Sequence, residues 1–190
     1  MQHNQFIKTL SENYSTMKTI ISILSVILAF LLRPPEMTGQ VDTGWIRIYD
    51  GPYFTDVSNA SCSDQAGAVY LTGYSAGAFH PDCLTVKYDS SGNLRWIRRF
   101  DGTGKREDEA NDMAIDDSAN LYISGFTLDT IPGNWATNAL IMKYDSAGNL
   151  KWLQSWDAEP SYADGSNIAT QIAVDTARNV YVAGYYSAFN

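Results

Sequence analysis

The residues of this sequence that could do chemistry are mainly carboxylates in the stretch 101–112, "DGTGKREDEAND". Five acidic side chains gather there: Asp101, Glu107, Asp108, Glu109 and Asp112. Ca²⁺ takes about six to eight oxygen ligands, so such a stretch could bind it. However, the D-x-D-x-D-G order of a calcium loop is absent, and Lys105 and Arg106 interrupt the cluster. A solvated acidic loop is therefore the preferred interpretation, and we expect no cofactor, with Ca²⁺ as the weaker alternative.

Histidine and nucleophile motifs give no support for catalysis. The sequence has two histidines, and only His80, in "AFHPD", lies outside the N-terminal segment. A zinc site, a Ser-His-Asp triad or a Cys-His pair would each need partners whose placement the sequence does not indicate. A Gly-rich phosphate loop and C-x-x-C do not occur in the sequence, and its G-x-S-x-G match, "GYSAG" at 73–77, is not followed by a predicted helix. We therefore predict no catalytic and no metal-binding residues.

The elements that must position these residues follow an internal repeat. Trp45, Trp96 and Trp152 begin the stretches "WIRIYDG", "WIRRFDG" and "WLQSWDA", at intervals of 51 and 56 residues. A second set of matches is "AVYLTGY", "NLYISGF" and "NVYVAGY", and a third is "LTVKYD" and "LIMKYD". Each unit holds four short runs rich in β-branched and aromatic residues, which favour strands. In the middle unit these strands are predicted at 110–116, 121–127, 139–145 and 150–157.

Four antiparallel strands in a period of about 50 residues are typical of a β-propeller blade. The sequence carries the patterns W-x3-aromatic-D-G, A-x-x-I-x-x-D, D-S-x-N-x-Y-x-x-G and K-Y-D-S-x-G-N-x-x-W. With these patterns, the range 45–186 resembles the SBBP-type β-propeller repeat of secreted bacterial proteins. The resemblance implies an architectural module rather than one particular activity. Arg178 departs from the pattern, because it stands where a turn Gly is expected.

We therefore predict an all-β fold of β-propeller blades, each a four-stranded antiparallel sheet, with about two and a half blades of a larger propeller. Residues 40–190 form this partial propeller. Its predicted parts are a lone fourth strand at 45–50, a blade at 57–101, a blade at 110–157 and a partial blade at 168–186. A closed ring needs about four blades or more, so we expect a fragment of a longer protein. A ring assembled from several such chains is the alternative.

Two octapeptides, "DSSGNLRW" at 89–96 and "DSAGNLKW" at 145–152, could be ligand sites or turns. An Asp that begins a turn accepts hydrogen bonds from N–H groups about two residues on, and Gly and Asn supply the positive φ of a tight hairpin. Both are therefore predicted to be hairpin turns between a third and a fourth strand. The residues with turn or packing roles are Asp89, Gly92, Asn93 and Trp96, and Asp145, Gly148, Asn149 and Trp152.

Two further sets of recurring residues indicate packing. Gly73, Gly125 and Gly184 occupy one place in the second strand of each unit, which indicates close approach of a neighbouring sheet. Trp96 and Trp152 are predicted to pack blade against blade, with stacking on sugars as the alternative.

The two cysteines are predicted to be free. Cys62 and Cys83 fall on the first and third strands of one sheet, about 9 to 10 Å apart at normal strand spacing. That separation exceeds the reach of a disulfide. Buried free thiols are therefore favoured over a bridge, although an oxidising compartment would allow one.

One face of the predicted fold is the better place for a ligand. Connections between antiparallel strands alternate between the two ends of a sheet, so the loops after the second and fourth strands share one face. Those loops vary in length and content, whereas the turns of the opposite face are tight and alike. Functional residues concentrate on loops held by a rigid scaffold. The candidate ligand-facing residues are Trp135, His80, Tyr162 and Asp164.

The apolar run at 20–32, "IISILSVILAFLL", follows Lys18 and is too short to span a bilayer. It suits the h-region of a secretory signal within residues 1–39, with a membrane anchor as the alternative. We therefore expect a secreted, periplasmic or cell-surface protein without membrane insertion after signal cleavage. The formal net charge of −8 disfavours nucleic acid and leaves a neutral or cationic ligand, such as a glycan or a protein.

Two functional hypotheses follow from the sequence. The preferred one is a non-catalytic repeat module with a binding, structural or adhesion role and an unknown ligand. The alternative is the N-terminal fragment of a propeller enzyme that acts on glycans, with its active residues in other blades.

Overall fold

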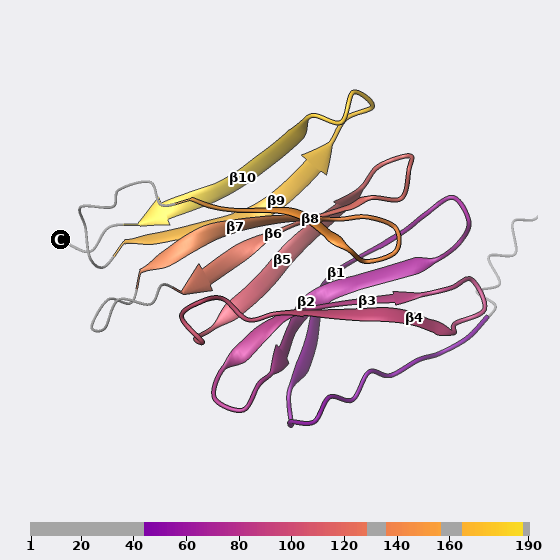
Figure 1. Cartoon of the computed structure of the whole chain (residues 1–190), viewed down its shortest axis with the longest axis horizontal. Helices are drawn as coiled ribbons and strands as arrows, with labels where there is room; N and C mark the ends of the chain where they lie inside the picture. The colour runs from indigo at the N-terminus through magenta and orange to yellow at the C-terminus, as the bar shows by residue number, and fades with distance from the viewer. Residues whose placement is uncertain (1–43, 129–135, 157–164, 188–190) are drawn as a thin grey trace, which may run out of the picture. The chain divides into compact units, whose positions relative to one another are not determined.

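The computed structural model describes residues 44–128, 136–156 and 165–187 and has ten β-strands there (Figure 1). Those ranges contain no helix, and so none that could cross a membrane. The predicted signal segment, 1–39, lies outside them. The strands are β1 (Asp56–Ser63), β2 (Val69–Ala76), β3 (Pro81–Tyr88), β4 (Leu94–Phe100), β5 (Asp108–Ile115), β6 (Leu121–Leu128), β7 (Thr137–Tyr144), β8 (Leu150–Trp156), β9 (Ser166–Val174) and β10 (Val180–Ser187).

The strands form three successive repeats. Repeat one is a four-stranded antiparallel sheet in the order β1-β2-β3-β4. Repeat two has the same order of antiparallel pairs, from β5 to β8. Repeat three consists of the β9-β10 pair, and β9 meets β7 through one parallel pair, Thr137 and Ser166. The predicted fold class, all-β with four-stranded antiparallel sheets, is confirmed.

Neighbouring repeats pack through the first strand of the later repeat. β5 lies against β1, β2 and β3 of repeat one, and β9 lies against β5, β6 and β7 of repeat two. In Figure 1 the strands follow one another from the purple ones of repeat one at the bottom of the view to the yellow ones of repeat three at the top. This arrangement is consistent with part of a propeller, and the described strands form no closed barrel.

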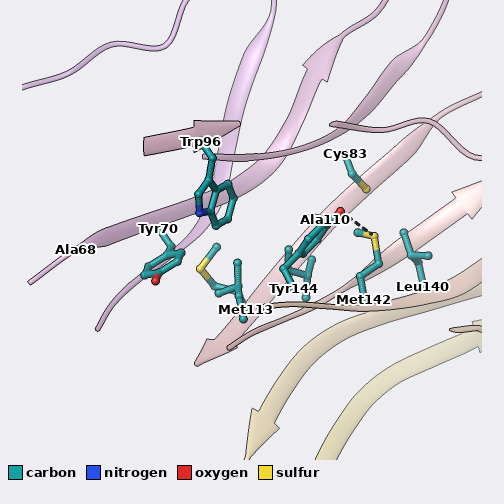
Figure 2. Close-up of a cluster of buried hydrophobic side chains, with 11 residues drawn as sticks. Ala68, Tyr70, Cys83, Trp96, Ala110, Met113, Leu140, Met142 and Tyr144 are labelled. Atoms are coloured by element: carbon teal, nitrogen blue, oxygen red, sulfur yellow. Dashed lines mark hydrogen bonds between the residues drawn. The ribbon is translucent and has the colours of Figure 1, made fainter. Parts of the chain in front are cut away.

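A hydrophobic core joins repeats one and two (Figure 2). Trp96 of β4 is 9% exposed, and its ring centroid lies 5.9 Å from that of Tyr70 in β2 and 6.4 Å from that of Tyr144 in β7. Met113 of β5 belongs to the same cluster. Burial of a large apolar side chain stabilises a fold by about 1.5–3 kcal/mol. The Trp of one repeat therefore contributes to the contact with the next.

The recurring Gly of the second strand lies opposite a β-bulge in its own sheet. The register between first and second strands shifts beside Gly73, Gly125 and Gly184. A Cβ at Gly125 would stand 1.9 Å from the carbonyl oxygen of Glu109, and one at Gly73 would stand 2.1 Å from that of Val57. The close approach is real, but it comes from the bulged partner strand and not from a neighbouring sheet.

Residues 44–50 have no regular secondary structure, in contrast to the lone strand predicted at 45–50. A fourth strand forms its hydrogen-bond ladder with a third strand, and no described strand pairs with this segment. Trp45 nevertheless packs on Tyr88 of β3, with 5.7 Å between ring centroids. Side-chain contacts therefore place the segment on repeat one, while Ile46 and Ile48 stay exposed.

Both cysteines are free thiols. Cys62 lies on β1 and Cys83 on β3, with β2 between them, as the repeat alignment predicts. Burial raises the pKa of the Cys62 thiol to about 11, so little reactive thiolate forms at neutral pH.

Candidate functional site

The β3–β4 and β7–β8 turns, which hold the two octapeptides, share one hydrogen-bonding pattern. The Asp89 carboxylate accepts hydrogen bonds from the Asn93 N–H at 2.9 Å, the Ser91 N–H at 2.9 Å and the Asn93 side-chain amide at 3.1 Å. Asp145 accepts the equivalent three from Ala147 and Asn149. The hydrogen bonds from the Asn residues hold the pKa of both carboxyls below its ordinary value. Both carboxylates are therefore used to stabilise turns.

Positive φ in these turns is confined to the glycines. Gly92 has φ 76° and Gly148 has φ 79°, whereas Asn93 and Asn149 are not in the left-handed region. The expectation that Asn shares this backbone role is therefore wrong, because its amide serves as a hydrogen-bond donor to the turn Asp instead. Arg178, in the β9–β10 turn, does adopt φ 68° at the place where a Gly is expected.

The β7–β8 turn also contacts Trp96 of the preceding repeat. The Trp96 indole N–H donates to the Ser146 carbonyl at 3.2 Å, and the Arg98 guanidinium donates to the Gly148 carbonyl. A Cβ at Gly148 would lie 2.9 Å from the Trp96 ring, so the close contact requires Gly. Trp45 makes the same contact with the preceding octapeptide, where its indole N–H donates to the Ser90 carbonyl at 3.1 Å.

The opposite face, which we call the loop face, carries the β2–β3 and β4–β5 connections. His80 lies there, exposed, and its carbonyl accepts a hydrogen bond from the Gly77 N–H at 2.8 Å. The other three candidate ligand-facing residues, Trp135, Tyr162 and Asp164, lie outside the described residues. Their role in binding stays a prediction.

Three carboxylates converge at the loop face, and we call them the rim cluster: Asp82, Asp101 and Asp108. Asp82 is near the start of β3, Asp101 directly follows β4, and Asp108 begins β5. Each offers an oxygen, and these oxygens all lie within 4.8 Å of one another. Among the described residues, these three carboxylates are close enough together to bind one metal ion.

Asp108 is the buried member of the rim cluster, at 1% exposure. Its Oδ2 accepts a hydrogen bond from the Gly102 N–H at 2.6 Å, whereas its buried Oδ1 has no hydrogen-bond partner. Burial raises the pKa of Asp108 to about 6, and the charges of Asp101 and Asp82 act in the same direction, while the hydrogen bond from the Gly102 N–H opposes the rise. Carboxylates with such environments are candidates for a functional role.

Arg99 is a cation beside the rim cluster. Its guanidinium donates to Asp82 Oδ2 at 2.8 Å, to the Ser75 hydroxyl at 2.6 Å and to the Ser75 carbonyl at 3.1 Å. These contacts direct Arg99 toward Asp82 and β2 of repeat one. Arg99 offsets the charge of Asp82, whereas the charges of Asp101 and Asp82 act to raise the pKa of Asp108.

The sequence alone indicates part of this cluster. The acidic stretch 101–112 contains two of its members, but Asp82 comes from another connection, and no sequence pattern joins it to them. A signal is nevertheless present, because the loops ending at Asp82 and beginning at Asp101 are predicted on the same face. What sequence patterns do not show is which side chains meet there.

Comparison with known proteins finds a distant relative that contains repeats. No protein-family model matches the chain. An uncharacterized WD repeat-containing protein of Acanthamoeba polyphaga mimivirus is 24% identical over 125 residues, which is 55% of this chain and 8% of the relative. The chain thus spans a small part of that protein. Together with the repeated four-stranded sheets, this similarity supports a propeller-like repeat module.

Proposed function

We propose that the chain is a non-catalytic, secreted or cell-surface propeller module of the SBBP type, which binds a neutral or cationic ligand at its loop face. The difference between the two faces carries this proposal. The octapeptide turns use their polar side chains for hairpins and for the contact with the preceding Trp. The loop face instead presents the exposed His80 and the rim cluster, which differ from repeat to repeat.

The negative charge of the chain supports a neutral or cationic ligand. The chain has a formal net charge of −8, and the rim cluster places three carboxylates together at the loop face. Such a surface repels polyanions and attracts cationic or neutral partners. The WD repeat-containing relative supports the repeat architecture of the proposed module. Export is supported by the apolar run at 20–32.

A glycan-cleaving role has one observation in its favour and one against. Asp108 has a pKa of about 6 beside other carboxylates, as a general acid in a glycosidase often has. However, Asp108 is 1% exposed and its carboxylate accepts the Gly102 N–H, so it cannot reach a glycosidic oxygen in this conformation. Binding without turnover is therefore the function that the geometry supports best.

A glycan array combined with product analysis tests the proposal on the full chain. We expect binding to a defined neutral or cationic ligand without release of shorter products. His80→Ala should weaken that binding, whereas Asp89→Ala with Asn93→Ala at the octapeptide turn should lower the Tm and leave affinity unchanged. Release of products would instead support the enzyme, and loss of affinity in the turn variant alone would place the ligand on the face of the octapeptide turns.

A further inference from the structure

We propose that Asp82, Asp101 and Asp108 bind one divalent cation of the Ca²⁺ class at the junction of repeats one and two. The inference goes beyond ligand binding at the loop face and does not depend on it, because an ion there would join two repeats whatever the loops bind. Asp82 belongs to repeat one, Asp108 begins repeat two, and Asp101 lies in the connection between them.

The spacing of the carboxylates suits such an ion. Ca²⁺ holds oxygen ligands at about 2.4 Å, so two ligands on opposite sides of the ion are about 4.8 Å apart. The three ligand oxygens of the rim cluster all lie within 4.8 Å of one another. All three can therefore contact one ion, and water or backbone carbonyls can complete its coordination. Carboxylate oxygens are hard ligands, which favours Ca²⁺ over softer transition metals.

The unpaired oxygen of Asp108 is the second, independent observation. Asp108 is 1% exposed, and its Oδ1 is buried without a hydrogen-bond partner. Folded proteins rarely leave a buried charged oxygen without a partner, because its lost hydration must be replaced by a hydrogen bond or a cation. The other oxygen of Asp108 is fixed by the Gly102 N–H at 2.6 Å, so the carboxylate is already oriented. A cation among the three carboxylates would supply the missing partner.

The neighbouring cation Arg99 does not supply the missing partner of Asp108. Arg99 contacts Asp82 at 2.8 Å and also donates to Ser75 and to the Ala76 carbonyl. It thus compensates the carboxylate of repeat one. The two remaining carboxylates of the cluster still carry like charges at short distance, which a divalent ion would offset.

The other repeats show that the fold itself does not demand this acidic set. Asp56 starts β1 as Asp108 starts β5, and its Oδ2 likewise accepts a Gly N–H, from Gly51 at 2.8 Å. Its Oδ1 is also buried without a partner, but within the described residues Asp56 belongs to no group of three ligating side chains. At the junction of repeats two and three, the matching positions hold the amides Asn138 and Asn167. Asp56 therefore serves as a matched control.

Thermal unfolding of the full chain tests the cation site. After EDTA treatment and dialysis, CaCl₂ is added at neutral pH, and calorimetric titration of the same samples measures the stoichiometry. We expect one site per chain and a Tm increase of about 3–5 °C at ten times the Kd. Asp108→Asn and Asp82→Asn should abolish this increase, and Asp56→Asn should keep it.

A milder variant keeps the test decisive if the buried substitutions prevent folding. Asp101 is the exposed member of the cluster, so Asp101→Asn is expected to fold and to weaken Ca²⁺ affinity at least tenfold. The proposal is overturned if Ca²⁺ leaves the Tm of the parent chain unchanged, or if Asp101→Asn and Asp56→Asn lose affinity equally. Stabilisation by acid without any response to Ca²⁺ would assign the cluster to a shared proton and would also overturn it.

Discussion

β6 and β10 carry the same motif and lie in very different surroundings. The strand β6, in "NLYISGF", is buried along nearly its whole length, whereas β10, in "NVYVAGY", is exposed along most of it. Tyr122 is 1% exposed and the matching Tyr181 is 58% exposed. β6 has partners on both sides and β9 packed against it, while β10 pairs with β9 alone among the described strands. Burial in this fold thus depends on the neighbouring repeat more than on the sequence of the strand.

The tryptophans of the fourth strands show the same contrast. Trp96 contacts Tyr70 of its own repeat and both Tyr144 and the octapeptide turn of the next. Trp152 is half-buried and has a ring contact with Tyr122 of its own repeat at 6.2 Å. The following repeat therefore completes the environment of each Trp.

The largest expected effect comes from removing the buried Trp. Trp96→Ala should lower the free energy of unfolding by about 3–5 kcal/mol, because it leaves a large cavity between repeats one and two. Trp152→Ala should cost about 1–2 kcal/mol, because its ring is only partly covered. Urea unfolding of both variants measures the difference. Equal losses would show that the half-buried Trp152 stabilises the fold as much as the buried Trp96 does.

A smaller effect is expected from the glycines opposite the bulges. A Cβ at Gly125 would collide with the Glu109 carbonyl inside a covered sheet, so Gly125→Ala should cost about 2–3 kcal/mol. Gly184→Ala creates the same collision with the Ile168 carbonyl, but β10 can shift because it pairs with one strand of the described part of the chain. We expect about 1 kcal/mol there, with faster amide hydrogen exchange confined to β9 and β10. A global loss of protection from Gly184→Ala would contradict this local effect.

The smallest effect concerns the pH dependence of the turns. Hydrogen bonds from Asn149 and Asn179 lower the pKa of Asp145 and Asp175 below 3.8. A carboxyl with a lowered folded-state pKa contributes stability above its unfolded pKa, and this contribution is lost as the pH falls through the folded-state value. Stability should therefore decline below about pH 4. Asp145→Asn should reduce this acid dependence in global unfolding, and Asp175→Asn only in hydrogen exchange of repeat three.

Much of this fold could be predicted from its sequence, because the repeat determines strand type, strand order and the face on which each connection lies. The three Trp stretches and the Asp-led turns identify the four-stranded units. Local patterns fail where long-range partners decide the outcome. Residues 44–50 have the sequence of a strand and no described strand to pair with.

The candidate site was predictable only in part for a similar reason. The acidic stretch after Asp101 is evident in the sequence, but Asp82 joins it through folding across two connections. The recurring Gly of the second strand indicates a close contact, but a sequence does not reveal on which side a bulge forms. Hydrogen-bond partners and bulges depend on register, which sequence patterns constrain only loosely.

The Trp that docks on the Gly of the following octapeptide has a consequence for how such chains can change length. The Trp and the octapeptide turn that it contacts both recur in the sequence. Each full repeat therefore has a turn that receives the preceding Trp, and a Trp in its fourth strand. Duplication or deletion of one whole repeat would recreate the same contact between Trp and octapeptide turn at the new boundary. Arrays of this kind can therefore be lengthened or shortened by single recombination events, and chimaeric assemblies can be engineered by cutting between the Asp-Gly that follows the Trp and the next first strand.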